Sequence, residues 1–333
     1  MVARIHHIGS KVAEYGLTLV AALTVNFALP HLAPGDPLRY VIGQAVADLS
    51  GAERTQLLAT YGLDQPLHVQ YVDYLFGIAR GDLGTSVMFG QPVASVLIDH
   101  LPSTLLLVGL TLVISTLAGT LLGAWSAWNE GTGTDGALLV ALVAANSTPA
   151  FWVGMVFVSV FAFHLGWFPS YGISAINEPD GIIQMLISRC IHLVLPLATL
   201  TLARVGGIYL VARGSVLTTT GADFIRFERA KGLSERTILF RHVLPNSLLP
   251  IYTRFTLQLG TLVGGAVVVE TVFSYPGLGL LIYDAALARD YPLLQGAFLV
   301  LTITVIGANV LADLTYPFLD PRTGPGHRER GVQ

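Results

Sequence analysis

Charge is scarce in this 333-residue chain. Asp, Glu, Lys and Arg make up 12% of the residues, whereas an average soluble domain contains about 25%. Hydrophobic residues make up 53%. The formal net charge is only -3, so bulk electrostatics indicate neither a nucleic-acid partner nor an acidic polymer. This balance is typical of a protein embedded in a lipid bilayer.

Cysteine and lysine are almost absent. Cys190 is the only cysteine, so the chain cannot form an internal disulfide, and no Cys/His cluster has the spacing of a metal site. The only lysines are Lys11 and Lys231, and neither lies in a G-x-x-x-x-G-K-[ST] phosphate-binding loop. No Ser/His/Asp or paired-carboxylate arrangement stands out. We therefore expect no metal, no cofactor, no catalytic residue and no ATP hydrolysis in this chain.

Long hydrophobic stretches are abundant instead. A helix needs roughly 20 apolar residues to cross a bilayer. Six stretches qualify, which predicts an all-α membrane protein with six transmembrane helices at about 15–33, 101–128, 137–167, 190–212, 248–273 and 294–318. Arg4 and Lys11 precede the first stretch, as in a signal peptide, but no A-x-A-like cleavage site follows. We expect an uncleaved anchor.

The distribution of Lys and Arg predicts the orientation, because basic residues are retained on the cytoplasmic side. With the N-terminus inside, the inner segments contain Arg4, Lys11, Arg213, Arg226, Arg229, Lys231, Arg236, Arg241, Arg322, Arg328 and Arg330. The outer segments contain only Arg39, Arg54, Arg80, Arg189 and Arg289. Both termini are therefore expected in the cytoplasm.

The first outer segment, 34–100, is long enough to be partly folded. Between Pro66 and the Gly81-Asp82 turn, four residues recur at helical spacing: Leu67, Tyr71, Tyr74 and Leu75. This pattern predicts an external helical subdomain. The spacing leaves open whether the helix meets a partner or only covers the helical bundle. The predicted division is 1–33 for the N-terminal segment and first helix, 34–100 for the outer loop, and 101–333 for a five-helix core.

A polar segment, FERAKGLSERTILFRHVLPN at 227–246, lies between the fourth and fifth stretches. Asp223 can cap a short helix in which Phe224, Phe227 and Ala230 share a face, and Gly232 can end it in the left-handed conformation. Ser234 can cap a second helix, and Pro245 is expected to mark the bend towards the fifth span. The sequence thus predicts two amphipathic helices meeting at an angle.

Such a cytoplasmic elbow could lie in the lipid headgroups or dock into a partner protein. The spacing bears on this choice, because nine residues separate Gly232 from His242-Val243-Leu244-Pro245. This arrangement resembles the E-A-A, G, I-x-L-P signature of ABC importer permeases. Only the glycine and the Leu-Pro pair match the general form literally.

Further blocks resemble the B-type permease of the dipeptide, oligopeptide and nickel importer family. They are HLAPGDPL (31–38), YGLDQPLHVQYVDYL (61–75), RGDLGTSV (80–87), LPSTLLL (101–107), ERAKGLSER (228–236), VVVETVFSYPGLG (267–279), ARDYPLLQG (288–296) and LDPR (319–322). The family variant R-x-x-R-A-K-G-L-S is matched by Arg226, Arg229, Ala230, Lys231, Gly232, Leu233 and Ser234.

This resemblance implies the type I ABC importer permease fold in a bacterial cytoplasmic membrane. It implies a path shared with a second homologous permease, one or two ATP-binding subunits that hold ATP and Mg, and an extracytoplasmic solute-binding protein. The coupling loop would be 213–247, with the ATPase-coupling residues Asp223, Arg226, Arg229, Ala230, Lys231, Gly232, Leu233, Ser234, Leu244 and Pro245. The binding protein would dock on 34–100 and on the loops near 170–188 and 275–292.

Polar residues within the spans are the candidates for the path, because they are costly in lipid. Asn146, Ser147 and Thr148 precede Pro149 in the third span, and Arg204 lies in the fourth. Interhelical hydrogen bonds or an ion pair would explain them equally well. Glu270, near the outer end of the fifth span, and Tyr275 are the candidates for an outer gate.

Peptides are the expected solute, and nickel, glutathione, haem or another small solute is the alternative. A self-sufficient secondary transporter would need inverted repeats, which the sequence does not display, and it would leave the elbow without a role. A membrane-bound scaffold or sensor would need no polar path.

Overall fold

The computed structural model describes residues 2–32, 38, 46, 49–60, 62–174 and 181–319. Parts of the predicted outer segments, including 39–45 and 175–180, lie outside this description. So do Arg39, Arg322, Arg328 and Arg330, which entered the charge count. The described residues form helices and no strand, apart from one isolated bridge between Thr85 and Pro92. They divide into two compact units.

The first unit contains the described residues up to Ser103 and Gly277–Gly307. Its helices are α1 (Val2–Leu32), α3 (Gly51–Thr60), α4 (Leu67–Ala79), the start of α5 (Val93–Trp128), α12 (Leu278–Ala288) and the start of α13 (Tyr291–Leu319). Its core is built from buried residues of α5, α12 and α13: Val93, Val96, Leu97, Leu278, Leu281, Ile282, Ala285, Leu293 and Ala297.

The helix predicted between Pro66 and the Gly81-Asp82 turn is confirmed as α4, which packs against α1. The Tyr71 hydroxyl lies 2.8 Å from the Thr24 hydroxyl. The buried Asn26 side-chain amide donates to the Tyr74 hydroxyl at 3.1 Å and to the Gln295 carbonyl at 2.7 Å. Asn26 therefore joins α1, α4 and α13, so α4 has packing partners within its own chain.

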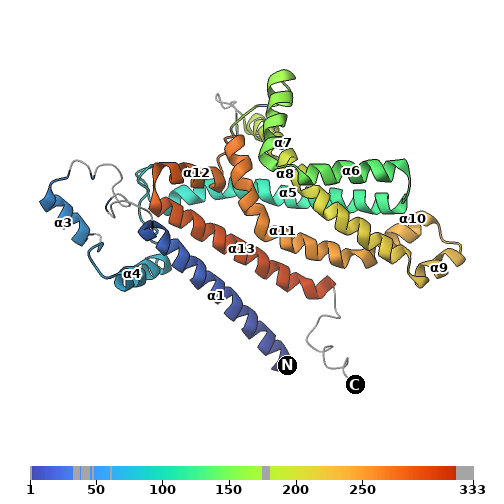
Figure 1. Cartoon of the computed structure of the whole chain (residues 1–333), viewed down its shortest axis with the longest axis horizontal. Coiled ribbons are helices and arrows are strands. Elements are labelled where there is room, and N and C mark those ends of the chain that lie inside the picture. Colours follow the sequence, from blue (N-terminus) through green and yellow to red (C-terminus); the bar gives the residue numbers. More distant parts are fainter. Residues whose placement is uncertain are drawn as a thin grey trace. The chain divides into compact units, whose positions relative to one another are not determined.

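The second unit contains Thr104–Pro276 and the part of α13 that begins at Ala308. It includes α6 (Gly133–Ser147), α7 (Ala150–Phe157), the π-helical segment η2 (Val158–His164), α8 (Ile182–Thr220) and α11 (Leu244–Val272). Between α8 and α11 lie α9 (Asp223–Ala230), α10 (Glu235–Thr237) and the π-helical segment η3 (Ile238–Val243). Helix α8 packs against α6, α7 and α11 (Figure 1).

Among the described residues, four helices are long and apolar enough to cross a membrane: Ala13–Leu32, Val93–Trp128, Ile182–Thr220 and Tyr291–Thr315. They match four predicted spans, and α11 covers the predicted fifth span as a 29-residue helix. The prediction of one continuous helix over 137–167 is wrong. The chain bends by 103° between α6 and α7. Pro149, which has no N–H to donate, lies at the bend as the N-cap of α7.

Helix α8 is longer than its predicted span of 190–212. Its 39 residues extend about 58 Å at 1.5 Å per residue, nearly twice the hydrocarbon thickness of a bilayer. A Cβ at Gly206 in this helix would lie 2.7 Å from Asn146 Cβ. Glycine at this position therefore lets α6 and α8 approach closely.

Candidate functional site

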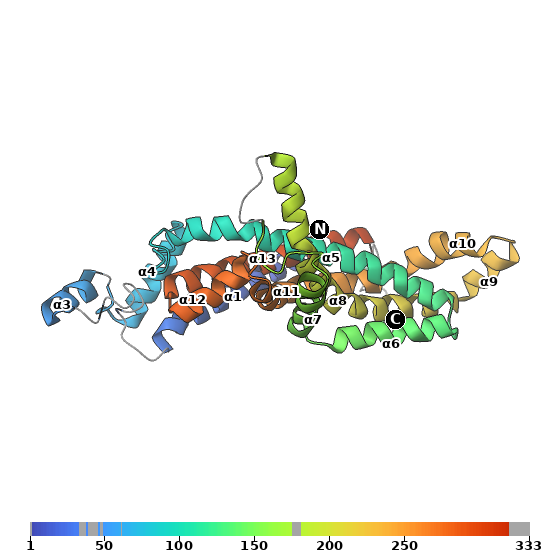
Figure 2. The same cartoon turned by 90° about the horizontal axis from the view of Figure 1, so that it is seen from above.

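The elbow connects the end of α8 to the start of α11. Figures 1 and 2 both show α9 and α10 at one end of these two helices. Gly232 has a φ of 78° and follows the C-cap residue Lys231, so the predicted left-handed stop is confirmed. The predicted cap at Ser234 is also confirmed, because its hydroxyl accepts a hydrogen bond from the Thr237 N–H at 3.3 Å.

Buried aliphatic side chains fix the elbow to the rest of the second unit. Ile225, Ile238 and Val243 are fully buried and pack with Val216 of α8 and Ala124 of α5. The guanidinium of Arg229 lies over the Trp128 ring, 5.9 Å from its centroid. The elbow therefore has a hydrophobic base, and its orientation relative to α5 and α8 is set by packing.

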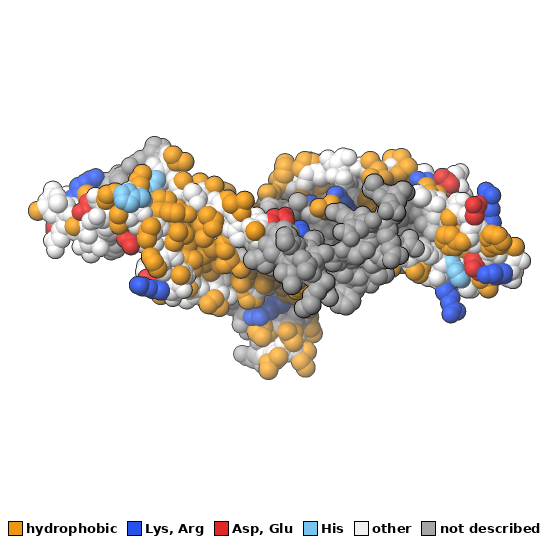
Figure 3. All heavy atoms as spheres, turned by 90° about the horizontal axis from the view of Figure 1, so that it is seen from below, with side chains coloured by type: hydrophobic (Ala, Val, Ile, Leu, Met, Phe, Trp, Pro, Cys, Tyr) orange, Lys and Arg blue, Asp and Glu red, His pale blue; other side chains and the backbone are white. Residues whose placement is uncertain are grey.

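The outward side of the elbow presents large hydrophobic residues. Phe224 is 41% exposed, Phe227 70% and Phe240 59%. The exposed Ala230, Gly232 and Leu233 lie among them in the sequence. Figure 3 shows hydrophobic side chains mixed with basic and acidic ones over this part of the molecule. We call Phe224, Phe227, Leu233 and Phe240 the elbow patch.

Three ion pairs border the elbow patch. Arg229 pairs with Glu235 at 3.2 Å, Lys231 with Glu228 at 3.0 Å, and Arg226 with Asp223 at 3.8 Å. At least one partner of each pair is well exposed to solvent. These pairs keep charges at the rim of the elbow patch and leave its aromatic rings uncovered.

One detail of the predicted elbow is wrong. Asp223 is the first helical residue of α9 and not its cap, because Ala222 holds the N-cap position without a side-chain hydrogen bond. Phe224, Phe227 and Ala230 are all exposed, and Ile225 is the buried residue of α9.

The chain around Pro245 is helical throughout. The chain stays helical from Glu235 to Val272 through η3, so Pro245 does not end the second elbow helix. The Leu244 N–H donates to the Leu239 carbonyl, five residues earlier, as in a π-helix. This wider turn precedes Pro245, which has no N–H of its own. The elbow therefore continues into α11 without a break.

A buried polar network joins α5, α6 and α8. We did not predict it from the sequence. Asp135 accepts two hydrogen bonds from Arg213, at 3.0 and 2.8 Å. The Ser126 hydroxyl donates to the same carboxylate and lies 2.6 Å from the Tyr209 hydroxyl. Arg213, followed by Ser126, holds the pKa of Asp135 well below its usual range. The only sequence signal was Asp135 itself, an acidic residue in the turn 129–136, which contains no basic residue.

The predicted path residues lie at the α6–α7 bend and on α8. Asn146 and Ser147 are exposed, Thr148 is half-buried at the C-cap of α6, and Arg204 is half-buried on α8. The Ser147 and Thr148 hydroxyls donate to the carbonyls of Val143 and Ala144, at 2.9 Å each, so these two side chains close local hydrogen bonds.

The predicted gate residues are both buried in the second unit. Glu270 is 0% exposed and its carboxylate accepts a hydrogen bond from the Thr104 hydroxyl at 2.7 Å. Tyr275 is 1% exposed, and its N–H donates to the main-chain carbonyl of Glu270 at 2.8 Å. This bond spans the turn after α11, where Ser274 has a φ of 44°.

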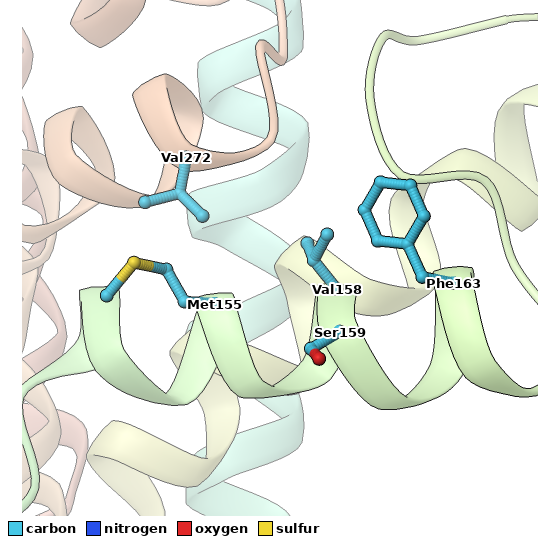
Figure 4. A pocket seen from close by; sticks show the side chains of 5 residues that line it. All are labelled: Met155, Val158, Ser159, Phe163 and Val272. Carbon is cyan, nitrogen blue, oxygen red and sulfur yellow. The ribbon is translucent and has the colours of Figure 1, made fainter.

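A shallow groove of about 350 Å³ follows α7 and η2. Met155, Val158, Ser159 and Phe163 line it, with Val272 from the end of α11. Figure 4 shows Val272 directed towards Met155 and Val158. Its lining is mostly apolar, and the described part of the chain contains no cluster of His, Cys, Asp or Glu side chains that could hold a metal.

The comparisons with known proteins agree on one family. The model of the family "Binding-protein-dependent transport system inner membrane component" matches residues 119–325. The oligopeptide transport system permease protein AppB of Bacillus subtilis is 34% identical over 305 residues, which cover 91% of this chain and 94% of that protein. The dipeptide transport system permease protein DppB of Escherichia coli is 33% identical over 324 residues, covering 92% and 94%.

A solved structure supports the fold. The inward-facing MetNI methionine ABC transporter contains a chain that matches with a TM-score of 0.54 at 18% identity, over 67% of this chain and 96% of that one. The structure thus has the fold of a type I ABC importer permease, as the sequence resemblance implied. The chain belongs to the family of binding-protein-dependent transport system inner membrane components, and it is a multi-pass protein of the bacterial inner membrane.

Proposed function

We propose that this chain and a second, homologous permease form the path of an ATP-driven importer for dipeptides or oligopeptides. The curated relatives are named as oligopeptide and dipeptide permeases, which supports peptides as the solute. A binding protein delivers the solute from outside, and partner subunits bind and hydrolyse ATP with Mg.

The elbow patch carries the coupling part of this proposal. Four large hydrophobic side chains are exposed on an element whose opposite side is fully buried. Exposed hydrophobic patches rimmed by charge are typical of protein interfaces. In this mechanism the patch inserts into a groove of an ATP-binding subunit. Closure of the ATP-binding subunits then moves α8 and α11 through the hydrophobic base of the elbow.

The rigidity of the elbow makes this transmission possible. Ile225, Ile238 and Val243 exclude water from the base, and Ser215 and Ser247 tie α8 to α11 through hydrogen bonds of 3.1 and 3.4 Å. A force on the patch therefore reaches both helices and is not absorbed by a loose linker.

A Gly232→Val substitution tests the coupling role. A β-branched residue at a φ of 78° costs about 1–3 kcal/mol locally, so the turn is expected to change shape. We expect ATP-driven uptake by the reconstituted complex to fall about 10-fold or more, because small displacements of functional groups can cost this much in rate. The amount of protein in the membrane should change little.

Gly166 provides a control, because it also has a positive φ, 62°, and nothing lies within 4 Å of its Cβ position. Gly166→Val imposes a similar backbone strain at an exposed position after η2, away from the elbow patch. Uptake per inserted protein should stay within about 2-fold of wild type, the range expected for a surface change. Equal uptake by both variants would contradict the coupling role. Uptake without any ATP-binding subunit would instead support a secondary transporter.

A further inference from the structure

Two arginines from neighbouring helices face the same region inside the membrane-spanning part of the second unit. Arg204 lies on α8 and Arg254 on α11, and these helices pack against one another. The two guanidinium groups are close enough for the charge of Arg254 to act on Arg204. Like charges repel, and charged side chains are expensive in a bilayer. A negatively charged group bound beside Arg254 would be attracted by both guanidinium groups.

A polar side chain from a third helix lies beside Arg254 at Gly207. A Cβ built on Gly207 would lie 2.9 Å from Arg254 Nη2 and 3.5 Å from Asn146 Oδ1. The absence of a side chain at Gly207 therefore leaves the space in which the guanidinium and the amide come together. Asn146 is exposed at the end of α6, one residue before the pair of hydroxyls that bond locally.

Arg254 also has an unused hydrogen-bond donor. Its Nε is buried and has no hydrogen-bond acceptor, and no acidic side chain among the described residues forms an ion pair with it. An unsatisfied buried donor costs free energy, most of all when it is charged. Such a group is stabilised when an anionic acceptor arrives.

We infer that Arg254, Arg204 and Asn146 form a binding site for a carboxylate group of the solute as it passes through the membrane. A guanidinium binds a carboxylate with two parallel hydrogen bonds, and the second positive charge increases the attraction. The Asn146 amide supplies a further N–H donor. The inference rests on the proposed transport function and names the chemistry of the solute at one point on its path.

A carboxylate site suits a peptide carrier of broad specificity. Every unmodified peptide has one α-carboxylate at its C-terminus, whatever its side chains. A site that holds this group orients the peptide without reading its sequence. A nickel ion is positively charged, unlike a carboxylate, so the same two arginines would repel it.

Thiol labelling at Asn146 tests the site without the binding protein. In a Cys190→Ser background, the Asn146→Cys thiol keeps Arg254 beside it. We expect an anionic methanethiosulfonate to react about 10-fold faster than a cationic one, after correction for their rates with a free thiol, because nearby positive charge concentrates anions. Arg254→Gln should remove most of this preference, and Arg254→Lys should retain it.

Arg189→Gln is the matched control, because Arg189 is an exposed arginine near the start of the same helix, α8. It should leave the charge preference unchanged. The variants are compared in the intact complex, at equal thermal stability, in each nucleotide state. Equal rates for the two reagents, or a preference that Arg254→Gln leaves intact, would overturn the inference.

Protection from labelling then separates the site from the solute assignment. A dipeptide should slow the reaction of the Asn146→Cys thiol, and its C-terminal amide at the same concentration should not. If neither form protects but succinate does, the carboxylate site stands and peptides are the wrong solute. Equal protection by the dipeptide and its amide would contradict the role of the carboxylate.

Discussion

The charges of the second unit lie in two contrasting places. In the buried network, the Asp135 side chain is 6% exposed and that of Arg213 is 19% exposed. In the elbow, Arg226 and Asp223 are 79% and 89% exposed. A buried pair depends on both partners, since removing one leaves an uncompensated charge, whereas an exposed pair contributes little to stability. The first arrangement holds helices together, and the second leaves a surface available to a partner.

The two places also differ in what surrounds them. The buried pair links residues 78 positions apart in the sequence and is supported by the Ser126 hydroxyl. The elbow pairs link residues at most six positions apart and border exposed phenylalanines. We therefore expect mutations in the network to act on folding and mutations in the elbow to act on coupling.

The largest effect on stability should come from Arg213→Met. This change leaves the Asp135 carboxylate buried without its main partner, and breaking a buried pair in this way typically lowers the melting temperature by about 10 °C. Thermal unfolding of the purified protein in detergent measures the effect. Arg236→Met, in the exposed elbow, is the control and should shift the melting temperature by less than about 2 °C. Equal shifts would remove the contrast between the two regions.

A smaller effect is expected from acid. The folded protein holds the pKa of Asp135 below its ordinary value of 3.8, so the carboxylate stabilises the folded state above that pH. This contribution is lost as the pH falls below about 4, because the unfolded chain then binds a proton that the folded protein excludes. The melting temperature of the wild type should fall more steeply between pH 5 and pH 3 than that of Asp135→Asn. Parallel profiles would contradict the buried ion pair.

The smallest effect should come from Arg226→Gln. Its pair with Asp223 spans 3.8 Å between two highly exposed side chains. Surface pairs of this kind contribute almost nothing, so the melting temperature should change by less than about 1 °C. A larger drop would mean that Arg226 supports the fold, and its assignment to the coupling surface would lose its basis.

Local signals in the sequence predicted much of the elbow and of the outer helix. Gly232 ends α9 because few other residues adopt its backbone conformation, and Ser234 caps α10 because its hydroxyl reaches the Thr237 N–H. Both effects act within a few residues. The same holds for α4, which follows the helical spacing of Tyr71 and Tyr74.

The failures have a different physical origin. The spacing predicted a shared face for Phe224 and Phe227 but did not predict which side of α9 is buried; Ile225 meets the core because α5 and α8 approach from that side. The partners Asp135 and Arg213 lie on different helices, so no local pattern connects them. Arg254 was placed near the start of a span, and only the packing of α6, α8 and α11 brings it beside Asn146.

Crosslinking can test whether the elbow patch docks into an ATP-binding subunit. Phe227→Cys in a Cys190→Ser background tests it most directly, because Phe227 is 70% exposed and forms no part of the hydrophobic base. Leu287→Cys, 69% exposed on α12, is the control. We expect a crosslink from Phe227→Cys to an engineered cysteine in the groove of the ATP-binding subunit, with a yield that changes between nucleotide states, and none from Leu287→Cys. No crosslink from Phe227→Cys in any nucleotide state would contradict docking by the elbow patch.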